Sequence, residues 1–275
     1  MQHSYLNRKR GVNAIMDFSR YDRPEVLDIL FYPRRESSGE SSNSGCEILE
    51  IPVEPDMILG GRYYHAGETS PLILFFHGNG EIAVDYEDVA SLYLKLGFSF
   101  LPVDYRGYGR SGGRPTVTAM MQDCHKIFDY VQKLRRERLH RGPLVVMGRS
   151  LGSASALELA SNYPQDIQAL IIESGFADIM PLLELLGISR GFLGYGEIDV
   201  FNHRDKIAAY KGPTLVIHAE RDHIISFSQG ITLYESSRSE NKNFLGIKGA
   251  NHNNIFQYGM REYFSAIKVM IDKGL

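Results

Sequence analysis

The sequence predicts an α/β protein with a mostly parallel central sheet and helices on both faces. Short apolar runs alternate along the chain with segments of helical periodicity, the pattern of successive strand–helix–strand units. The inner runs, such as LILFF at 72–76, are continuously apolar, which is typical of strands buried on both faces. A length of 275 residues is enough to bury such a sheet in one domain.

The predicted elements follow one another regularly after a polar stretch, ESSGESSNSG, at 36–45. We predict strands at 47–53, 57–65, 72–77, 98–105, 144–148, 169–174, 214–219 and 244–248. We predict helices at about 82–96, 117–139, 152–162, 228–237 and 256–273. Residues 1–45 are expected to form an N-terminal extension with one short helix in RPEVLDILFYP, and residues 46–275 to form the main domain.

One connection is longer than the others. From Gly175 to Gly212 the chain separates two predicted strands and includes the apolar stretch FADIMPLLELLGISRGFLGYG. We expect residues 176–211, approximately, to form a small cap over a site. An ordinary crossover with an extra helix is the alternative. The side chains expected to line an apolar substrate pocket are Phe176, Ile179, Met180, Leu183, Phe192 and Leu193.

Composition narrows the class of protein. The net charge is −3 and the basic residues are scattered, so we expect no nucleic-acid partner. Two cysteines, Cys46 and Cys124, are too few for a disulfide framework and suit a reducing compartment. The first residues lack the apolar core of a signal peptide, and the apolar runs are strand-length. These features predict a cytoplasmic protein without a membrane anchor.

The segment VMGRSLGSAS at 146–155 places Ser150 between two glycines, after a predicted buried strand and before a helix of small residues. A G-x-S-x-G pattern alone is weak, but this context is that of a sharp strand-to-helix turn. Gly148 and Gly152 would allow the close approach that such a turn needs. The turn lifts Ser150 above the sheet as a candidate nucleophile.

A serine nucleophile needs a base and an acid, which in this arrangement follow it in the order Ser, acid, His. His252 is the only histidine in the polar loop KGANHNNIF before the last helix, and it is the predicted base. Asp222, in the loop after TLVIHA, is the predicted acid. The open alternatives are His223 for the base and Glu220, Glu173 or Asp178 for the acid.

Stabilising a developing oxyanion takes two N–H donors. HGNG at 77–80 lies at the end of one predicted strand, where its glycines let the backbone turn its N–H groups inward. The amide of Asn79 is one predicted donor. That of Leu151, at the start of the helix after Ser150, is the other.

Together these motifs resemble the α/β-hydrolase superfamily. The resemblance covers about residues 46–273 and includes HGNG, DYRGYGRSGGRPT, GRSLG, IIES, VIHAERDHII and GANHNN. It is closest to the serine-hydrolase branch described as lysophospholipase-like, acyl-protein-thioesterase-like or serine-aminopeptidase-like. It implies Ser150 as nucleophile, His252 as base, Asp222 as acid, and the Asn79 and Leu151 amides as oxyanion donors.

Cofactors are not expected. GYGRSG at 107–112 has the G-x-G-x-x-G pattern of a dinucleotide-binding turn. However, Arg106 precedes it and Arg114-Pro115 follow it, so we predict no helix beginning at its last glycine. His218, Glu220, Asp222 and His223 do not have metal-ligand spacing on one helical face. We predict no bound metal or nucleotide.

The sequence thus predicts a serine hydrolase that cleaves a small or medium acyl ester or thioester through an acyl-enzyme. Two alternatives stay open. One is an aminopeptidase-type amide hydrolase, in which Glu173 or Glu184 would recognise a free amine. The other is a non-enzymatic protein that binds a ligand on the same fold. Acyl-chain length, leaving group and oligomeric state are not indicated by the sequence.

Overall fold

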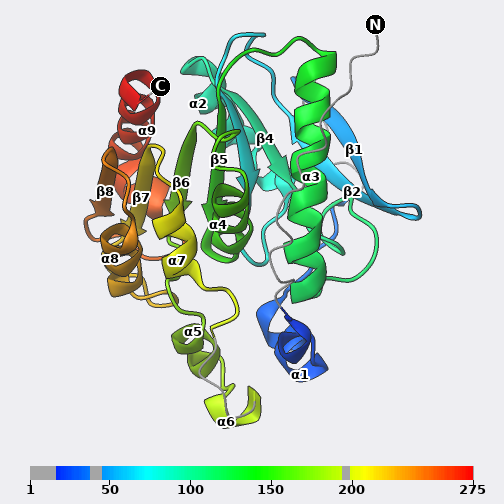
Figure 1. The fold of residues 1–275 in the computed structure, drawn as a ribbon, viewed down its shortest axis with the longest axis vertical. Helices are drawn as coiled ribbons and strands as arrows, with labels where there is room; N and C mark the ends of the chain where they lie inside the picture. Colours follow the sequence, from blue (N-terminus) through cyan, green and yellow to red (C-terminus); the bar gives the residue numbers. More distant parts are fainter. Residues whose placement is uncertain (1–16, 38–44, 194–198, 275) are drawn as a thin grey trace, which may run out of the picture.

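A computed structural model describes residues 17–37, 45–193 and 199–274 of the chain (Figure 1). An eight-stranded sheet forms its centre, in the order β1-β2-β4-β3-β5-β6-β7-β8. The strands are β1 (Glu47–Glu54), β2 (Met57–Tyr63), β3 (Leu72–Phe76), β4 (Ser99–Val103), β5 (Leu144–Arg149), β6 (Ala169–Glu173), β7 (Thr214–Ala219) and β8 (Lys242–Ile247). β2 pairs antiparallel with β1 and β4, and all other pairs are parallel. The α/β prediction and its eight strands are confirmed.

Helices cover both faces of the sheet. They are α1 (Pro24–Leu30), α2 (Glu87–Lys95), α3 (Val117–Glu137), α4 (Ser153–Asn162), α5 (Met180–Leu185), α6 (Arg190–Leu193), α7 (His203–Ala209), α8 (Phe227–Ser236) and α9 (Ile255–Gly274). Three short 3₁₀ helices are η1 (Ser19–Tyr21), η2 (Ala83–Tyr86) and η3 (Ser150–Gly152). α3, α4, α7 and α8 lie on one face, and α2 and α9 on the other (Figure 1).

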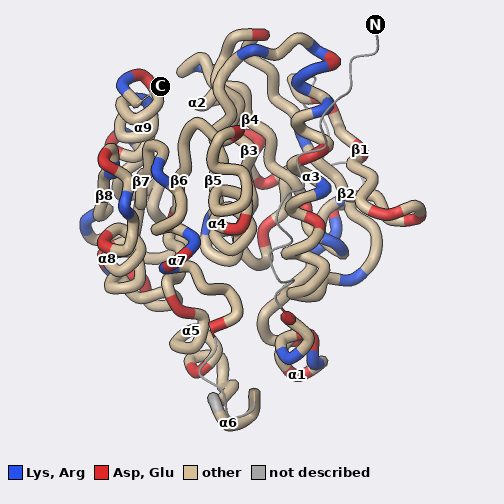
Figure 2. Tube along the Cα trace, viewed as in Figure 1, with Lys and Arg blue, Asp and Glu red and all other residues tan. Residues whose placement is uncertain are grey.

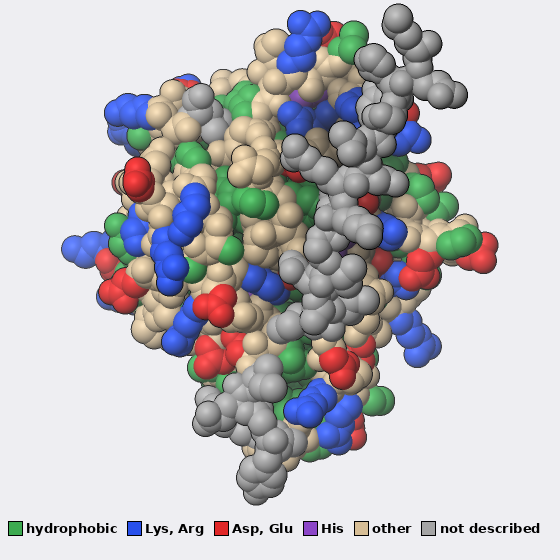
Figure 3. Space-filling model, viewed as in Figure 1, with side chains coloured by type: hydrophobic (Ala, Val, Ile, Leu, Met, Phe, Trp, Pro, Cys, Tyr) green, Lys and Arg blue, Asp and Glu red, His purple; other side chains and the backbone are tan. Residues whose placement is uncertain are grey.

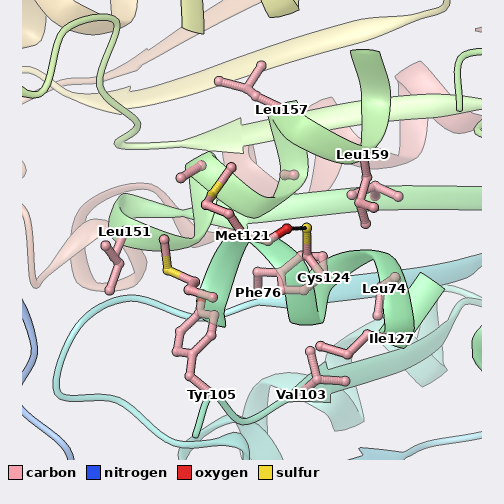
Figure 4. Close-up of a cluster of buried hydrophobic side chains, with 14 of the residues drawn as sticks. Leu74, Phe76, Val103, Tyr105, Met121, Cys124, Ile127, Leu151, Leu157 and Leu159 are labelled. Atoms are coloured by element: carbon pink, nitrogen blue, oxygen red, sulfur yellow. Dashed lines mark hydrogen bonds between the residues drawn. The ribbon is translucent and has the colours of Figure 1, made fainter. Parts of the chain in front are cut away.

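The sheet divides the apolar core in two because successive side chains of a strand point to opposite faces. In β3, Leu72, Leu74 and Phe76 belong to the cluster beneath α3 and α4, whereas Ile73 and Phe75 belong to the cluster beneath α2 and α9. Figure 4 shows part of the first cluster. A strand buried on both faces explains why the run LILFF is continuously apolar.

The N-terminal segment packs onto the first of these clusters. Phe18, Tyr21, Val26, Leu30 and Phe31 are all buried within it. The short helix expected in this segment is α1, which ends before Pro33. Of the polar stretch 36–45, residues 38–44 lie outside the described ranges. The described part of the predicted extension therefore shares its core with the main domain.

The surface carries charges of both signs. Lys and Arg residues lie close to Asp and Glu residues in most parts of the trace (Figure 2). On the face drawn in Figure 3, hydrophobic side chains form small groups between charged ones. Among the helices of the described ranges, none has the length and apolar character to cross a bilayer.

Candidate active site

The turn at Ser150 is as sharp as the sequence predicts. β5 ends at Arg149, and Ser150 takes a φ of +50°, a left-handed conformation that is costly for an L-residue. A Cβ on Gly148 would lie 2.3 Å from the carbonyl oxygen of Gly152. A Cβ on Gly152 would lie 2.1 Å from the carbonyl oxygen of Phe76 in β3. Both flanking positions therefore require glycine for the turn to close onto the sheet.

Ser150, His252 and Asp222 form one hydrogen-bonded chain. His252 Nε2 lies 3.0 Å from Ser150 Oγ, and His252 Nδ1 lies 2.7 Å from Asp222 Oδ2. The three side chains follow β5, β8 and β7, so each extends from the carboxyl end of a parallel strand. All three residues are buried. Segments more than 100 residues apart in the sequence thus meet at one point.

The environment of Asp222 holds it in the ionised form. Its Oδ1 accepts hydrogen bonds from the amides of Ile224 at 3.0 Å and Ile225 at 2.9 Å. Burial works against ionisation, but the hydrogen bond and charge of His252 and these two amides outweigh it, so the pKa of Asp222 lies below its ordinary value. An ionised carboxylate only accepts, so His252 presents Nδ1–H to it and leaves the lone pair of Nε2 toward Ser150.

The alternative acids and the alternative base have other environments. Glu173 accepts from Arg149 at 2.9 Å and from the Tyr263 hydroxyl at 2.7 Å. Asp178 accepts from the Met180 amide at the start of α5. His223 is exposed on the loop that carries Asp222. The geometry thus brings Asp222, rather than these residues, to His252.

The two predicted oxyanion donors lie at the ends of neighbouring strands. Leu151 follows β5, its side chain points into the apolar core (Figure 4), and its N–H belongs to the first turn of η3. Amides in a first helical turn lack acceptors within the helix. Asn79 follows β3 in a turn in which the Gly78 carbonyl accepts from the Glu81 amide at 3.4 Å. The two amides thus lie in turns that follow β3 and β5, which are adjacent strands in the sheet.

The side chain of Asn79 has a role that the sequence reasoning missed. Its Oδ1 accepts from the Tyr32 amide at 2.7 Å and from the Tyr108 hydroxyl at 2.6 Å. Tyr108 belongs to the glycine-rich turn 107–112, so that turn holds the Asn79 loop. The dipeptide Asn79-Gly80 between a strand and a helix indicates a turn. It does not indicate which groups bond to the Asn79 side chain, because both donors are distant in sequence.

The N-terminal segment links the Asn79 loop to the predicted cap. The Arg23 guanidinium donates to the Phe192 carbonyl at 2.7 Å and lies 3.9 Å above the Phe192 ring. The rings of Phe18 and Tyr21 contact that of Phe201, with centroids 5.6 and 5.5 Å apart. α1, α5 and α6 accordingly lie at the same end of the molecule (Figure 1).

The structure describes residues 176–193 and 199–211 of the predicted cap, which include α5, α6 and α7. Of the six predicted pocket residues, Phe176, Ile179 and Leu183 are fully buried in the core. The other three, Met180, Phe192 and Leu193, pack partly buried against the same cluster. The insertion is thus anchored by half of the predicted residues, and the other half retain exposed surface.

No group of three His, Cys, Asp or Glu side chains within the described ranges is arranged to hold a metal ion. The glycine-rich turn 107–112 packs tightly on its own strand end, since a Cβ on Gly109 would lie 2.2 Å from Asp104 Oδ2. Its glycines therefore serve close packing beside the site.

Comparison with known proteins identifies relatives across most of the chain. Residues 67–193 match the family model described as serine aminopeptidase, S33. Alpha/beta hydrolase domain-containing protein 17C of Mus musculus is 32% identical over 239 residues, 83% of this chain and 68% of that protein. Alpha/beta hydrolase domain-containing protein 17B of Homo sapiens is 30% identical over 210 residues, 74% of this chain and 67% of that protein.

Solved structures show the same fold. The esterase Pf2001 of Pyrococcus furiosus matches with a TM-score of 0.69 and 20% identity, covering 88% of this chain and 98% of that one. Est1E of Butyrivibrio proteoclasticus, with ferulic acid bound, matches with a TM-score of 0.68 and 19% identity, covering 82% and 98%.

Proposed function

The chain belongs to the α/β-hydrolase family, and we propose that it is a hydrolase of the esterase or thioesterase type that cleaves its substrate through an acyl-enzyme on Ser150. The observation that carries the proposal is the chain of hydrogen bonds from Ser150 through His252 to Asp222 at a strained turn. These three residues act as nucleophile, base and acid.

The reaction proceeds in two halves. Ser150 Oγ attacks the substrate carbonyl while His252 Nε2 takes its proton, and the amides of Asn79 and Leu151 stabilise the oxyanion. The imidazolium then protonates the leaving alcohol or thiol, and the C–O or C–S bond breaks. In the second half His252 takes a proton from water, hydroxide adds to the acyl carbon, and Ser150 leaves with the returned proton.

The substrate is a small molecule with a small or medium acyl group. Met180, Phe192 and Leu193 keep exposed apolar surface on a short cap, which suits a short acyl chain. An ester or thioester is favoured over an aminoacyl amide because Glu173, a candidate for recognising a free amine, is already bonded to Arg149 and Tyr263. A series of p-nitrophenyl acyl esters compared with aminoacyl anilides tests this preference.

Labelling with a fluorophosphonate probe tests the nucleophile. We expect the wild type to label, and Ser150→Ala and His252→Ala to lose labelling while remaining folded. Ser155→Ala, in α4, is a matched control, since Ser155 is also buried but its hydroxyl has no partner within the described chain. Labelling that persists in Ser150→Ala would contradict the proposal, as would the absence of labelling in folded wild type.

A further inference from the structure

Arg149 is the last residue of β5 and directly precedes Ser150. Its side chain is 10% exposed. Its guanidinium donates to Glu81 Oε1 at 2.8 Å, to Glu173 Oε1 at 2.9 Å and to the carbonyl oxygen of His252 at 3.0 Å. One buried side chain therefore ties the Ser150 turn to three other segments.

Two of these contacts lead to groups of the candidate site. The bond to the His252 carbonyl fixes the backbone of the residue whose imidazole faces Ser150. The bond to Glu81 fixes a carboxylate whose second oxygen accepts from the Gly78 amide at 2.7 Å. Gly78 begins the turn that presents the Asn79 amide. The guanidinium thus reaches both the base and the oxyanion loop.

The remaining contacts make the surroundings of the guanidinium rigid. Arg149 and Glu173 are register partners in the parallel pair β5–β6. The Tyr263 hydroxyl donates to Glu173 Oε2 at 2.7 Å, and the Tyr86 hydroxyl donates to Glu81 Oε2 at 2.6 Å. Each carboxylate is therefore held by Arg149 on one oxygen and by a tyrosine on the other.

The charge balance of this cluster requires a cation at Arg149. Burial disfavours the ionised form of Glu81, but the charge of Arg149 and the hydrogen bond from Tyr86 outweigh it and lower the pKa of Glu81 to about 2. A lysine would supply the charge but not the planar fork of donors, which here points to three acceptors at once. The site therefore uses the geometry of the guanidinium as well as its charge.

We propose that Arg149 is a positioning residue for the reaction. By bonding the His252 carbonyl and Glu81 together, it holds the imidazole and the Asn79 amide at their places around Ser150. This inference rests on the proposed function, because it assigns Arg149 a role through His252 and Asn79.

Replacement of Arg149 by lysine separates geometry from charge. Arg149→Lys keeps a cation beside Glu81 and Glu173 but loses the fork of donors. A displacement of the base or of the oxyanion donor by about 1 Å lowers the rate by roughly 10²-fold. We therefore expect kcat for a p-nitrophenyl acyl ester to fall by about this factor while KM changes little. The rate of fluorophosphonate labelling should fall in parallel.

Arg135→Lys is the matched control. Arg135 lies near the opposite end of β5, in α3, and donates to the Gly142 carbonyl two residues before the strand begins. It is also partly buried, so its replacement tests for general loss of stability. Both variants are measured with urea unfolding, kcat, KM and the downfield proton resonance of the His252–Asp222 hydrogen bond. A shifted or lost resonance in Arg149→Lys alone indicates a displaced imidazole.

The outcomes separate the two proposals. A folded Arg149→Lys with wild-type kcat and resonance overturns the positioning role, as does an equal loss of kcat in both arginine variants. If the wild type neither labels nor hydrolyses esters, the proposed function fails, and the resonance alone decides the role of Arg149. If Arg149→Lys does not fold, Glu81→Gln replaces it, and a lower kcat with unchanged KM supports the role whereas unchanged kcat overturns it.

Discussion

Replacing Asp222 by asparagine changes one atom of the candidate triad, and the structure fixes which way the amide must turn. If the new NH₂ group faced the amides of Ile224 and Ile225, one partly buried and one buried N–H group would lose their acceptor, at a cost of about 2–6 kcal/mol in total. Even the lower figure disfavours this orientation roughly 30-fold. The NH₂ group must therefore face His252.

That orientation changes the tautomer of the His252 imidazole. An NH₂ group donates to His252 Nδ1, so the ring proton moves to Nε2, where it faces Ser150 Oγ and cannot accept the hydroxyl proton. We expect kcat to fall by a factor on the order of 10³–10⁴, with little change in KM. The assay is steady-state hydrolysis of a p-nitrophenyl ester, with circular dichroism to establish folding.

Asp123→Asn is the matched control for this change. Asp123 is another buried carboxylate, bonded to Arg106 in a bidentate pair and belonging to α3. We expect this control to lose stability but to keep the kcat of its folded fraction. A folded Asp222→Asn variant whose kcat stays within about tenfold of wild type would refute the tautomer argument, because a tenfold loss of kcat is far smaller than the loss that the wrong tautomer causes.

Three further predictions concern stability. Leu139 has a φ of +51° in the turn after α3 and is 64% exposed, so Leu139→Gly should be about 1 kcal/mol more stable than Leu139→Ala in urea unfolding; equal stability would contradict the strain argument. Burial opposes ionisation of Glu158, but the hydrogen bond from His125 and the charge of Lys206 lower its pKa from 4.5 to about 2. Above pH 4.5, ionised Glu158 therefore adds up to about 3 kcal/mol to the free energy of unfolding, and this contribution is lost as the pH falls toward 2. In acid unfolding, the difference in free energy of unfolding between wild type and Glu158→Gln should therefore shrink as the pH falls over that range. A difference that stays constant would refute this prediction. Gly152→Ala should lower the free energy of unfolding by about 1–3 kcal/mol because the new Cβ would clash with the carbonyl oxygen of Phe76. A calorimetric midpoint equal to that of wild type would contradict this prediction.

Much of the fold could be predicted because its signals are local. The inner strands are apolar runs bounded by polar or glycine residues, and the observed bounds of the eight strands differ from the predicted ones by at most two residues. The positions of Ser150, Asp222 and His252 were predictable because each lies in the turn or loop that follows a strand, and parallel strands bring their carboxyl ends together. Their catalytic roles remain a proposal that the labelling experiment tests.

Other features depend on contacts between distant segments. Arg106 bonds Asp123 and Glu54, and Asp104 accepts from the Ala83 amide. Neighbours in sequence gave no indication of these partners. The contacts of Arg149 and of the Asn79 side chain were missed for the same reason, since nothing near either residue marks its acceptors or donors.

The long sequence separations within the site have a consequence for biosynthesis. Ser150 and His252 are 102 positions apart, and Arg149 and the His252 carbonyl 103. A chain leaving the ribosome can form the sheet up to β7 while Ser150 still lacks the imidazole of His252 as a partner. If Ser150 and His252 have the roles proposed above, the serine becomes reactive only when β8 has paired with β7 and the loop that carries His252 has been translated, so the nascent polypeptide stays inert until then.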